Sequence, residues 1–320
     1  MTDCRKTGLV TFGETMGLVT ALETGPLEYA RSFGYGIGGA ESNVAIGVVR
    51  LGGAATWFGR LGADATGDLI ERRLRAEGVD IRGIRQGGFT GLMVRHRRGA
   101  TAVRVDYHRA GSAASRLRPE DVPVELIRGA GVLHVTGITP ALSDSAAEAV
   151  RYATDLARDA GVTVSVDINH RSKLWSPDRA RPVLADLAGR ADVLFAGIAE
   201  AELLLGPGAA RSSAALACAL AGLGPRQAVL KEGARGCTAV VDGTAYVQPA
   251  PSVPVVDPVG AGDAFVAGYL AELLARRSVE QRLRTAVESG AYAVTVAGDC
   301  EGLPRRADLA DVTSGEEVTR

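Results

Sequence analysis

The 320-residue chain has few cysteines, and their arrangement narrows the class of protein. Cys4, Cys218, Cys237 and Cys300 form no C-x-x-C pair, and none has a histidine nearby at metal-ligand spacing. This arrangement argues against a zinc site and against a disulfide framework. We therefore expect reduced and mostly buried thiols.

Long apolar runs and an excess of one charge are also missing. No stretch approaches the roughly 18 apolar residues of a membrane span, and charges in "MTDCRKTGLVTFGE" occupy the place of a signal peptide's apolar core. The 36 basic and 37 acidic side chains leave a formal net charge of -1, so no whole-chain field favours nucleic acid or a membrane. We expect a cytoplasmic protein without nucleic-acid or membrane partners.

One short basic run, "RHRR" at residues 95–98, suggests a polyanion site at first sight. It has no interleaved aromatic residues and lies at a predicted hairpin turn in a nearly neutral chain. A solvated turn is therefore the interpretation that we adopt for it.

Hydrophobic residues are abundant, at 46%, and occur in β-type runs that alternate with amphipathic stretches. This rhythm predicts one α/β domain over residues 1–320, with a doubly wound, mostly parallel central sheet flanked by helices. Two of the expected helices are Ala40–Leu51, stopped by Gly52-Gly53, and Thr66–Glu77, with Thr66 as N-cap. The expected strands are "LVTFG", "AATWFG", "VLHVTG", "VTVSVDI", "DVLFAG", "AVLKEG" and "CTAVV".

A second, smaller sheet is predicted from two segments that break this rhythm. Residues 89–109 contain two β-type runs around a Gly99-Ala100 turn, which indicates an antiparallel hairpin. Alternation in the second run places Val103, Val105, Tyr107 and Arg109 on one face. Together with the early segment, we expect a β-sheet lid formed by approximately residues 14–38 and 88–110.

Residues 34–39 read "GYGIGG" and match the dinucleotide fingerprint G-x-G-x-x-G. The match lacks a clean preceding strand, and the next strand ends in Gly59-Arg60 rather than in an acidic residue, so we reject a nicotinamide site. The glycines would instead let a small polar ligand approach the helix that begins at Ala40. A flexible connection to that helix is the alternative.

The stretch "VPVVDPVGAGDAFVAGYLAELL", residues 253–274, carries the chemistry. The backbone amides of Gly260, Ala261 and Gly262 precede a helix and would form an anion hole with the positive end of its dipole. Asp263 at its mouth could accept a proton from an attacking hydroxyl. From residue types alone, Asp263 could equally be an N-cap.

Two motifs in this order resemble the ribokinase (phosphofructokinase-B-type) family of ATP-dependent sugar kinases: "GIGGAESNVAIGVVRLGG" and "DPVGAGDAFVAGYL". The resemblance runs from Gly13-Glu14 to Gly302–Pro304. It implies a ribokinase-like fold, Asp263 as the base that deprotonates the acceptor hydroxyl, and Gly260–Gly262 amides that stabilise the transferred phosphoryl group.

The resemblance also implies where the nucleotide and metal bind. Lys231, Gly233 and Gly236 in "LKEGARG" match a K-x-G-x-x-G pattern beside ATP, although the same residues suit a hairpin turn. Glu200 would hold Mg²⁺ through water, while Gly197 stands where the family carries asparagine. A requirement for a monovalent cation such as K⁺ near Asp257 is left open.

Four strings resemble the 2-keto-3-deoxygluconate kinases within this family: "GGAESNVAIG", "YHRAGSAASRL", "DINHRSKLW" and "GDCEGLP". The guanidinium groups of Arg109 and Arg171 would bind the carboxylate of a sugar acid, or else lie solvated at the surface. The resemblance further implies substrate contacts from Gly38, Asn43 and Tyr107. Such kinases can carry a tyrosine at the position of Met93, which would remove one hydrogen bond here.

The sequence thus predicts transfer of the ATP γ-phosphoryl group to the terminal hydroxyl of 2-keto-3-deoxygluconate or a similar sugar acid. Two alternatives stay open: a fructokinase-like kinase of a neutral sugar, and a sugar-binding regulator that has lost catalysis. Homo-oligomers could form through the lid sheet.

Overall fold

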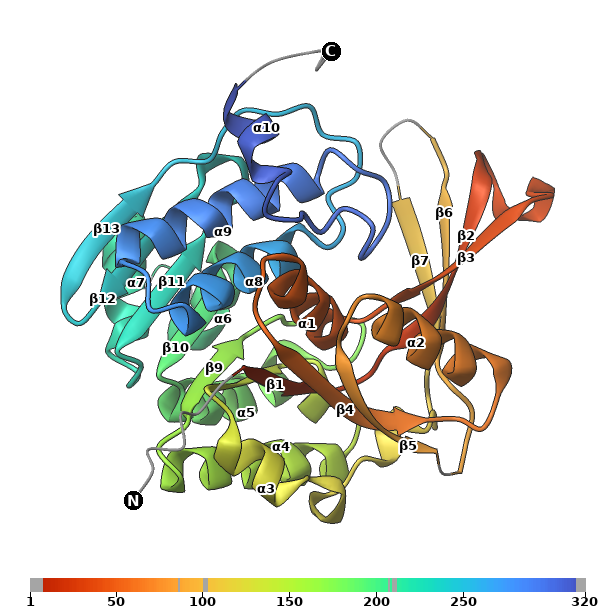
Figure 1. Ribbon diagram of the computed structural model, residues 1–320, viewed down its shortest axis with the longest axis horizontal. Helices are drawn as coiled ribbons and strands as arrows, with labels where there is room; N and C mark the ends of the chain where they lie inside the picture. Colours follow the sequence, from red (N-terminus) through yellow and green to blue (C-terminus); the bar gives the residue numbers. More distant parts are fainter. Residues whose placement is uncertain (1–7, 86, 100–102, 207, 209–211, 315–320) are drawn as a thin grey trace.

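A nine-stranded sheet forms the centre of the computed structural model, which describes residues 8–85, 87–99, 103–206, 208 and 212–314 (Figure 1). Its order is β13-β12-β11-β10-β9-β8-β1-β4-β5, and all neighbours from β11 to β5 are parallel. The bounds are β1 Leu9–Phe12, β4 Ala55–Leu61, β5 Asp80–Arg85, β8 Val132–Thr136, β9 Thr163–Asp167, β10 Val193–Gly197, β11 Gln227–Lys231, β12 Cys237–Val241 and β13 Thr244–Gln248. The predicted mostly parallel α/β sheet is confirmed.

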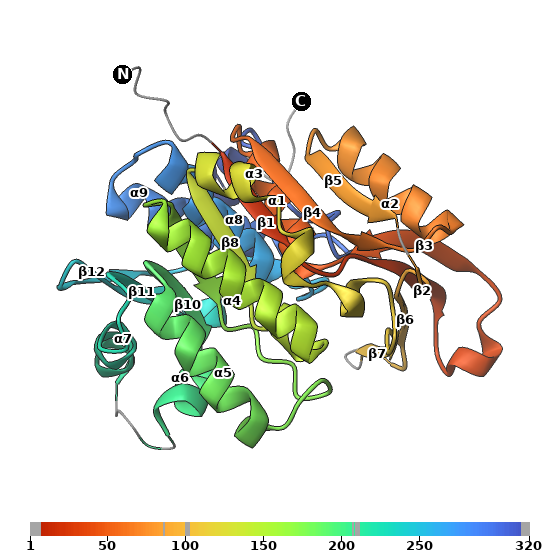
Figure 2. The ribbon, with the colours of Figure 1, turned by 90° about the horizontal axis from the view of Figure 1, so that it is seen from below.

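Helices cover both faces of this sheet (Figures 1 and 2). One face carries α1 (Ala40–Arg50), α8 (Ala261–Leu274) and α9 (Val279–Ala293), with α2 (Ala65–Ala76) beside β5 and α10 (Leu309–Ser314) against α9. The other carries α3 (Val124–Gly129), α4 (Asp144–Asp159), α5 (Pro177–Arg190), α6 (Ile198–Leu205) and α7 (Ser213–Ala221). Strand alternation divides the core: Leu9 packs on the first face, Val10 and Phe12 on the second.

A separate four-stranded sheet has the order β3-β2-β6-β7 and lies to one side of the large sheet (Figure 1). It consists of β2 (Met16–Thr24), β3 (Phe33–Gly38), β6 (Leu92–Arg97) and β7 (Val103–His108), which we call the small sheet. β6 and β7 are antiparallel, as expected, although Ala100 of their predicted turn lies outside the described residues. β2 and β6 are parallel neighbours, so the early and later segments join in one sheet.

Several local predictions were wrong. The alternative of a flexible connection at residues 33–38 is excluded, because these residues form β3, which pairs with β2 and leads directly into α1. Helix α2 is capped by Asp64, whose side chain accepts from the Gly67 amide at 2.8 Å. Thr66 lies inside the helix, and its hydroxyl is 2.5 Å from that of Tyr35. Edge strands β5 and β13 were not predicted, because their exposed residues form no apolar run.

The basic run at 95–98 also differs from its interpretation as a solvated turn. Arg95 and His96 are buried because they belong to β6 itself, and only Arg98, beyond the strand, is exposed. Arg95 and His96, which lie within the strand, are thus buried, whereas Arg98 beyond its end reaches solvent.

The thiols agree only partly with expectation. Cys237 and Cys300 are buried, Cys218 is exposed, and Cys4 lies outside the described residues. Within the part of the chain that the structure describes, no helix is long and apolar enough to cross a membrane.

Candidate active site

The first turn of α8 begins at a glycine, as the predicted anion site requires. Its N-cap is Gly260, at a φ of 77°, which has no side chain that could cap the helix. A Cβ on Gly260 would collide with the carbonyl oxygen of Asp299, so only glycine fits both the backbone angle and the space. The N-terminal amides of α8 therefore keep free donors at the positive end of the helix dipole.

Asp263 is not the N-cap of this helix but belongs to its first turn. Its side chain is buried, and Oδ2 accepts a hydrogen bond from Asn43 Nδ2 at 2.8 Å. Burial, and then the nearby carboxylate of Asp299, raise the pKa of Asp263 to about 7. A carboxylate with this pKa is suited to accept a proton near neutral pH.

Asp299 is a second carboxylate at the same point, and the sequence analysis did not identify it as a site residue. The Nδ2 group of Asn43 also donates to Asp299 Oδ1, at 2.6 Å. Burial raises the pKa of Asp299 as well. Its place in "GDCEGLP", a string already associated with sugar acid kinases, was the available signal.

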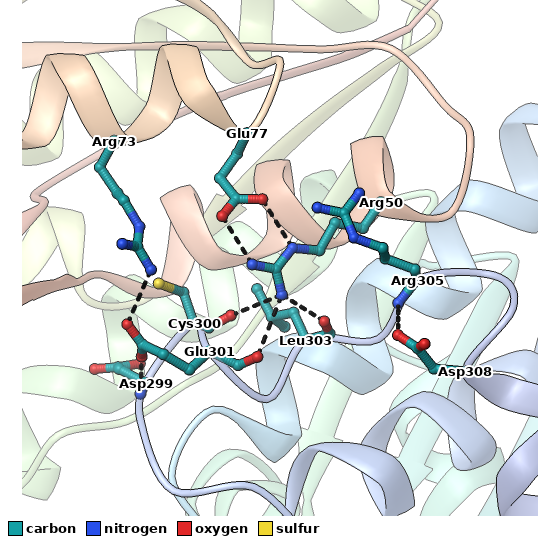
Figure 3. A network of polar contacts seen from close by, with 9 residues as sticks. All are labelled: Arg50, Arg73, Glu77, Asp299, Cys300, Glu301, Leu303, Arg305 and Asp308. Atoms are coloured by element: carbon teal, nitrogen blue, oxygen red, sulfur yellow. Dashed lines mark hydrogen bonds and ion pairs between the residues drawn. The ribbon is translucent and has the colours of Figure 1, made fainter. Parts of the chain in front are cut away.

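The segment that carries Asp299 is held by Arg50 of α1 (Figure 3). Arg50 Nη1 donates to the carbonyl oxygens of Cys300 at 3.1 Å, Glu301 at 3.3 Å and Leu303 at 2.5 Å. The same guanidinium is fixed by Glu77 through two bonds of 2.9 and 2.8 Å. Asn43 lies on the same helix, so α1 positions both the amide and the segment with its carboxylate.

Lys231 at the end of β11 lies beside this site. An ideal Cβ on Gly262 would be 3.9 Å from Lys231 Nζ, and the ammonium contacts both oxygens of Asp167 at 2.7 Å. Burial acts to lower the pKa of Lys231, but the carboxylates of Asp167 and Glu200 outweigh it, and the pKa is raised. The lysine therefore stays charged. Asp167, at the carboxyl end of β9, is a further residue that the sequence analysis did not select.

Gly233 and Gly236 form the turn between β11 and β12, as the simpler interpretation of "LKEGARG" predicts. Both have positive φ, 60° and 95°, and a Cβ on Gly236 would collide with the Gln248 carbonyl oxygen. Their contact with a nucleotide stays a prediction.

Glu200 lies in the first turn of α6, directly after β10, and its charge acts to raise the pKa of Lys231. Its Oε2 accepts from the Gly197 amide at 2.6 Å and its Oε1 from the His170 amide at 2.9 Å, so the carboxylate is held in one orientation. In the described residues, no group of three or more His, Cys, Asp or Glu side chains could hold a metal directly. This donor set fits Mg²⁺ bound largely through water and phosphate, because each Glu200 oxygen retains a lone pair.

The two predicted carboxylate-binding arginines differ in environment. Arg109, just beyond β7, is nearly buried, forms an ion pair with the fully buried carboxylate of Glu14, and lies 5.7 Å from the centre of the Tyr107 ring. Its Nε has no partner among the described residues. Arg171 is exposed, and its charge acts to lower the pKa of both Asp263 and Asp299, which places it within electrostatic reach of them.

Lys173, which the sequence analysis did not select either, connects the loop that carries Arg171 to the small sheet. Its Nζ donates to the Val105 carbonyl of β7 at 2.8 Å and lies 5.7 Å from the centre of the Tyr107 ring. The loop that carries Arg171 thus contacts the small sheet next to Tyr107 and Arg109.

Gly38 and Met93 define another wall of the site. A Cβ on Gly38 would collide with Asp299 Oδ2 and would lie 2.6 Å from Met93 Cε. Met93 is buried with Met16 and Leu18, so its side chain offers an apolar surface where a tyrosine would offer a hydroxyl. Sequence-predicted Gly38 and Asn43 therefore lie around the Asp263–Asp299 pair.

Comparison with known proteins finds relatives over nearly the whole chain. A 2-dehydro-3-deoxygluconokinase from Bacillus subtilis (strain 168) is 37% identical over 98% of this chain and 97% of its own. A 2-dehydro-3-deoxygalactonokinase from Haloferax volcanii is 36% identical over 91% of this chain and 92% of its own. The crystal structure of a PfkB protein from Polaromonas sp. JS666 is similar with a TM-score of 0.86 and 36% identity, covering 95% of this chain and 99% of that one. The model of the pfkB family carbohydrate kinases matches residues 6–306. The chain therefore belongs to the pfkB family of carbohydrate kinases, and its fold is ribokinase-like.

Proposed function

We propose that this kinase transfers the γ-phosphoryl group of ATP to the primary hydroxyl of a 2-keto-3-deoxy sugar acid. The observation that carries the proposal is the buried Asp263, with a pKa of about 7, at the open N-terminus of α8. The names of the two curated relatives support a sugar acid as the acceptor.

In this mechanism Asp263 accepts the proton of the acceptor hydroxyl as its oxygen attacks the phosphorus atom in line. The amides of Gly260–Gly262 and the Lys231 ammonium stabilise negative charge on the phosphoryl oxygens. Glu200 would orient the water shell of Mg²⁺, which neutralises phosphate charge when it is bound. Asn43 holds Asp263 in place through the 2.8 Å bond.

Recognition of the sugar acid is assigned to the cationic end of the site. Arg171 is free to turn its guanidinium to a substrate carboxylate, and Arg109 presents an unpartnered Nε beside Tyr107. Gly38 leaves room for the substrate next to Asp299. The small sheet, which contributes Gly38 and Tyr107, would then cover the bound sugar as a lid.

The test is a coupled assay of ADP release with ATP and Mg²⁺. Turnover is compared for 2-keto-3-deoxygluconate, its galactonate epimer, fructose, ribose and adenosine at equal concentration, and an Asp263→Asn variant serves as the catalytic control. We expect turnover on the keto acids alone. Turnover on a neutral sugar would contradict the proposed sugar acid acceptor but not the kinase activity. Sugar binding without ADP release would favour a non-catalytic regulator.

A homo-oligomer through the small sheet is a further part of the proposal. Large apolar side chains on β2 and β3 are exposed, including Leu22 at 66%, Phe33 at 47% and Tyr35 at 50%. Phe33 and Tyr35 lie on one face of the small sheet, because Phe33 pairs with Ala21, and Leu22 lies on the other. Exposed apolar side chains of this kind could pair with another chain. Light scattering of the purified protein, compared with a Leu22→Glu/Phe33→Glu variant, tests it: a wild-type monomer would contradict the proposal.

A further inference from the structure

The loop before the anion site contains a buried carboxylate whose partner comes from the small sheet. Asp257 and Arg95 of β6 are both buried, and Arg95 Nη1 lies 3.0 Å from Asp257 Oδ2. Asp257 stands three residues before Gly260, the N-cap of α8. An ion pair therefore links β6 to the loop that leads into the anion site.

Asp257 also organises the backbone around it. Its Oδ1 accepts from the Val259 amide and its Oδ2 from the Gly298 amide, each at 3.2 Å. One bond thus shapes the approach to Gly260, and the other holds the residue before Asp299. The orientation of the Asp257 carboxylate consequently affects both the anion site and the second carboxylate.

Arg95 already contacts two oxygens that could otherwise ligate a monovalent cation near Asp257. Its Nη1 is 3.0 Å from Asp257 Oδ2 and 3.4 Å from the carbonyl oxygen of Gly298. A second cation here would lie against a guanidinium that is always protonated, and the two charges would repel each other. The residues present do not fit K⁺ at this position.

From these contacts we infer that Arg95 is a positioning residue that takes the place of a monovalent cation, so that turnover does not depend on K⁺. The inference rests on the proposed role of the Gly260–Gly262 amides. Arg95 neutralises Asp257 from within the chain, and the charge pair then holds the loop in the geometry that the phosphoryl group requires. The neighbouring Arg97 of β6 donates to the Val256 carbonyl at 3.1 Å and attaches the same strand to the same loop.

Removal of Arg95 would leave a buried carboxylate without a counter-charge. In the Arg95→Ala protein the loop should shift, and we expect kcat to fall by about 10- to 100-fold while the KM for the sugar changes little. Potassium or guanidinium ions could then enter the vacated space and restore part of the turnover. Arg95→Lys keeps a charge in reach and should stay independent of K⁺.

The experiment measures ADP release in potassium chloride, sodium chloride and tetramethylammonium chloride at equal ionic strength. We use the wild-type protein, Arg95→Ala, Arg95→Lys and the matched control Arg104→Ala. Arg104 of β7 is 56% exposed and pairs only with Asp106 among the described residues, so its loss should leave every reading unchanged. Hydrogen exchange of residues 256–262 supplies a readout independent of turnover: faster exchange in Arg95→Ala, slowed again by guanidinium, is expected.

The outcomes separate this inference from the proposed function. A several-fold rise of wild-type turnover with K⁺ would overturn the inference but leave the proposed kinase activity intact. This comparison does not depend on a variant that could fail to fold. Full kcat in Arg95→Ala also overturns it. Rescue of Arg95→Ala by guanidinium or K⁺ supports it, whereas a lower melting temperature without rescue would reduce Arg95 to a structural role. If the wild type turns over no sugar in any salt, the proposed function has failed instead.

Discussion

Asn43 joins the carboxylates of Asp263 and Asp299 through a single amide group, with distances of 2.8 and 2.6 Å from Nδ2. Two buried acids that share one donor cannot both ionise freely, because each charge opposes the other. This relationship accounts for part of the raised pKa of Asp263, and it connects the proposed base to Asp299, which the sequence did not single out.

The pH dependence of turnover should report this coupling. If Asp263 is the base, kcat/KM rises with pH through an apparent pKa of about 7. Asp299→Asn removes a charge that raises the Asp263 pKa, so the rise of kcat/KM should move to lower pH by about half a unit or more. Asp308→Asn, a carboxylate farther along the segment in Figure 3, should leave the profile in place. An unchanged pH profile in Asp299→Asn would show that the charge of Asp299 does not affect the pKa of Asp263.

Asp263→Asn should separate stability from catalysis. The folded-state pKa of Asp263 lies above its unfolded value of 3.8, so stability falls as pH rises from about 4 to about 7, where the unfolded chain ionises this group and the folded chain does not. The neutral amide avoids this loss, and we expect its free energy of unfolding at about pH 8 to exceed that of wild type by about 1–4 kcal/mol. Below about pH 4 the difference should vanish, because Asp263 is then protonated in the unfolded chain as well as in the folded one. Urea denaturation at both pH values measures it.

The same variant should lose turnover by about 10²- to 10⁴-fold with little change in the KM for either substrate. Nearly wild-type kcat in Asp263→Asn would rule out Asp263 as the base.

The two arginines should respond differently to alanine substitution. Arg171→Ala is expected to raise the KM for the sugar acid by about 10-fold or more without a change in melting temperature, because Arg171 is exposed. Arg109→Ala leaves Glu14 buried and unpaired, and should cost about 3–5 kcal/mol of stability as well. Thermal unfolding beside steady-state kinetics distinguishes them. Equal effects of both changes on stability would show that the environments described for the two side chains do not differ in solution.

Gly197 offers a test of the magnesium assignment. Its φ is −79°, and an ideal Cβ there would have Glu200 Oε2, at 3.5 Å, as its nearest neighbour, so asparagine fits without strain. Gly197→Asn adds an oxygen ligand for the metal's water shell, and should lower the Mg²⁺ concentration for half-maximal turnover by about 10-fold. Gly197→Ala is the control for backbone effects. An unchanged Mg²⁺ requirement in both variants would argue that the metal does not lie beside α6.

The parallel sheet and the glycine-led start of α8 could be predicted because both leave local signals. Buried strands form apolar runs, and glycines before a helix indicate exposed amides. Asp299, Asp167 and Glu14 were missed because their roles depend on partners far away in the sequence, such as Asn43 and Arg109. Arg95 was interpreted wrongly for the same reason: a charge within "RHRR" is typical of solvent exposure until its carboxylate is known.

The parallel pairing of β2 with β6 has a consequence for how the chain folds. Gly17 of β2 pairs with Leu92 of β6, and the chain between these two residues includes strand β4 and helices α1 and α2. Closing so long a loop is entropically costly before its contacts exist, so the small sheet should assemble after the first half of the large sheet. A growing chain that does not yet include Leu92 would therefore leave one edge of β2 unpaired. We expect chaperones to be needed most while β6 is still being synthesised.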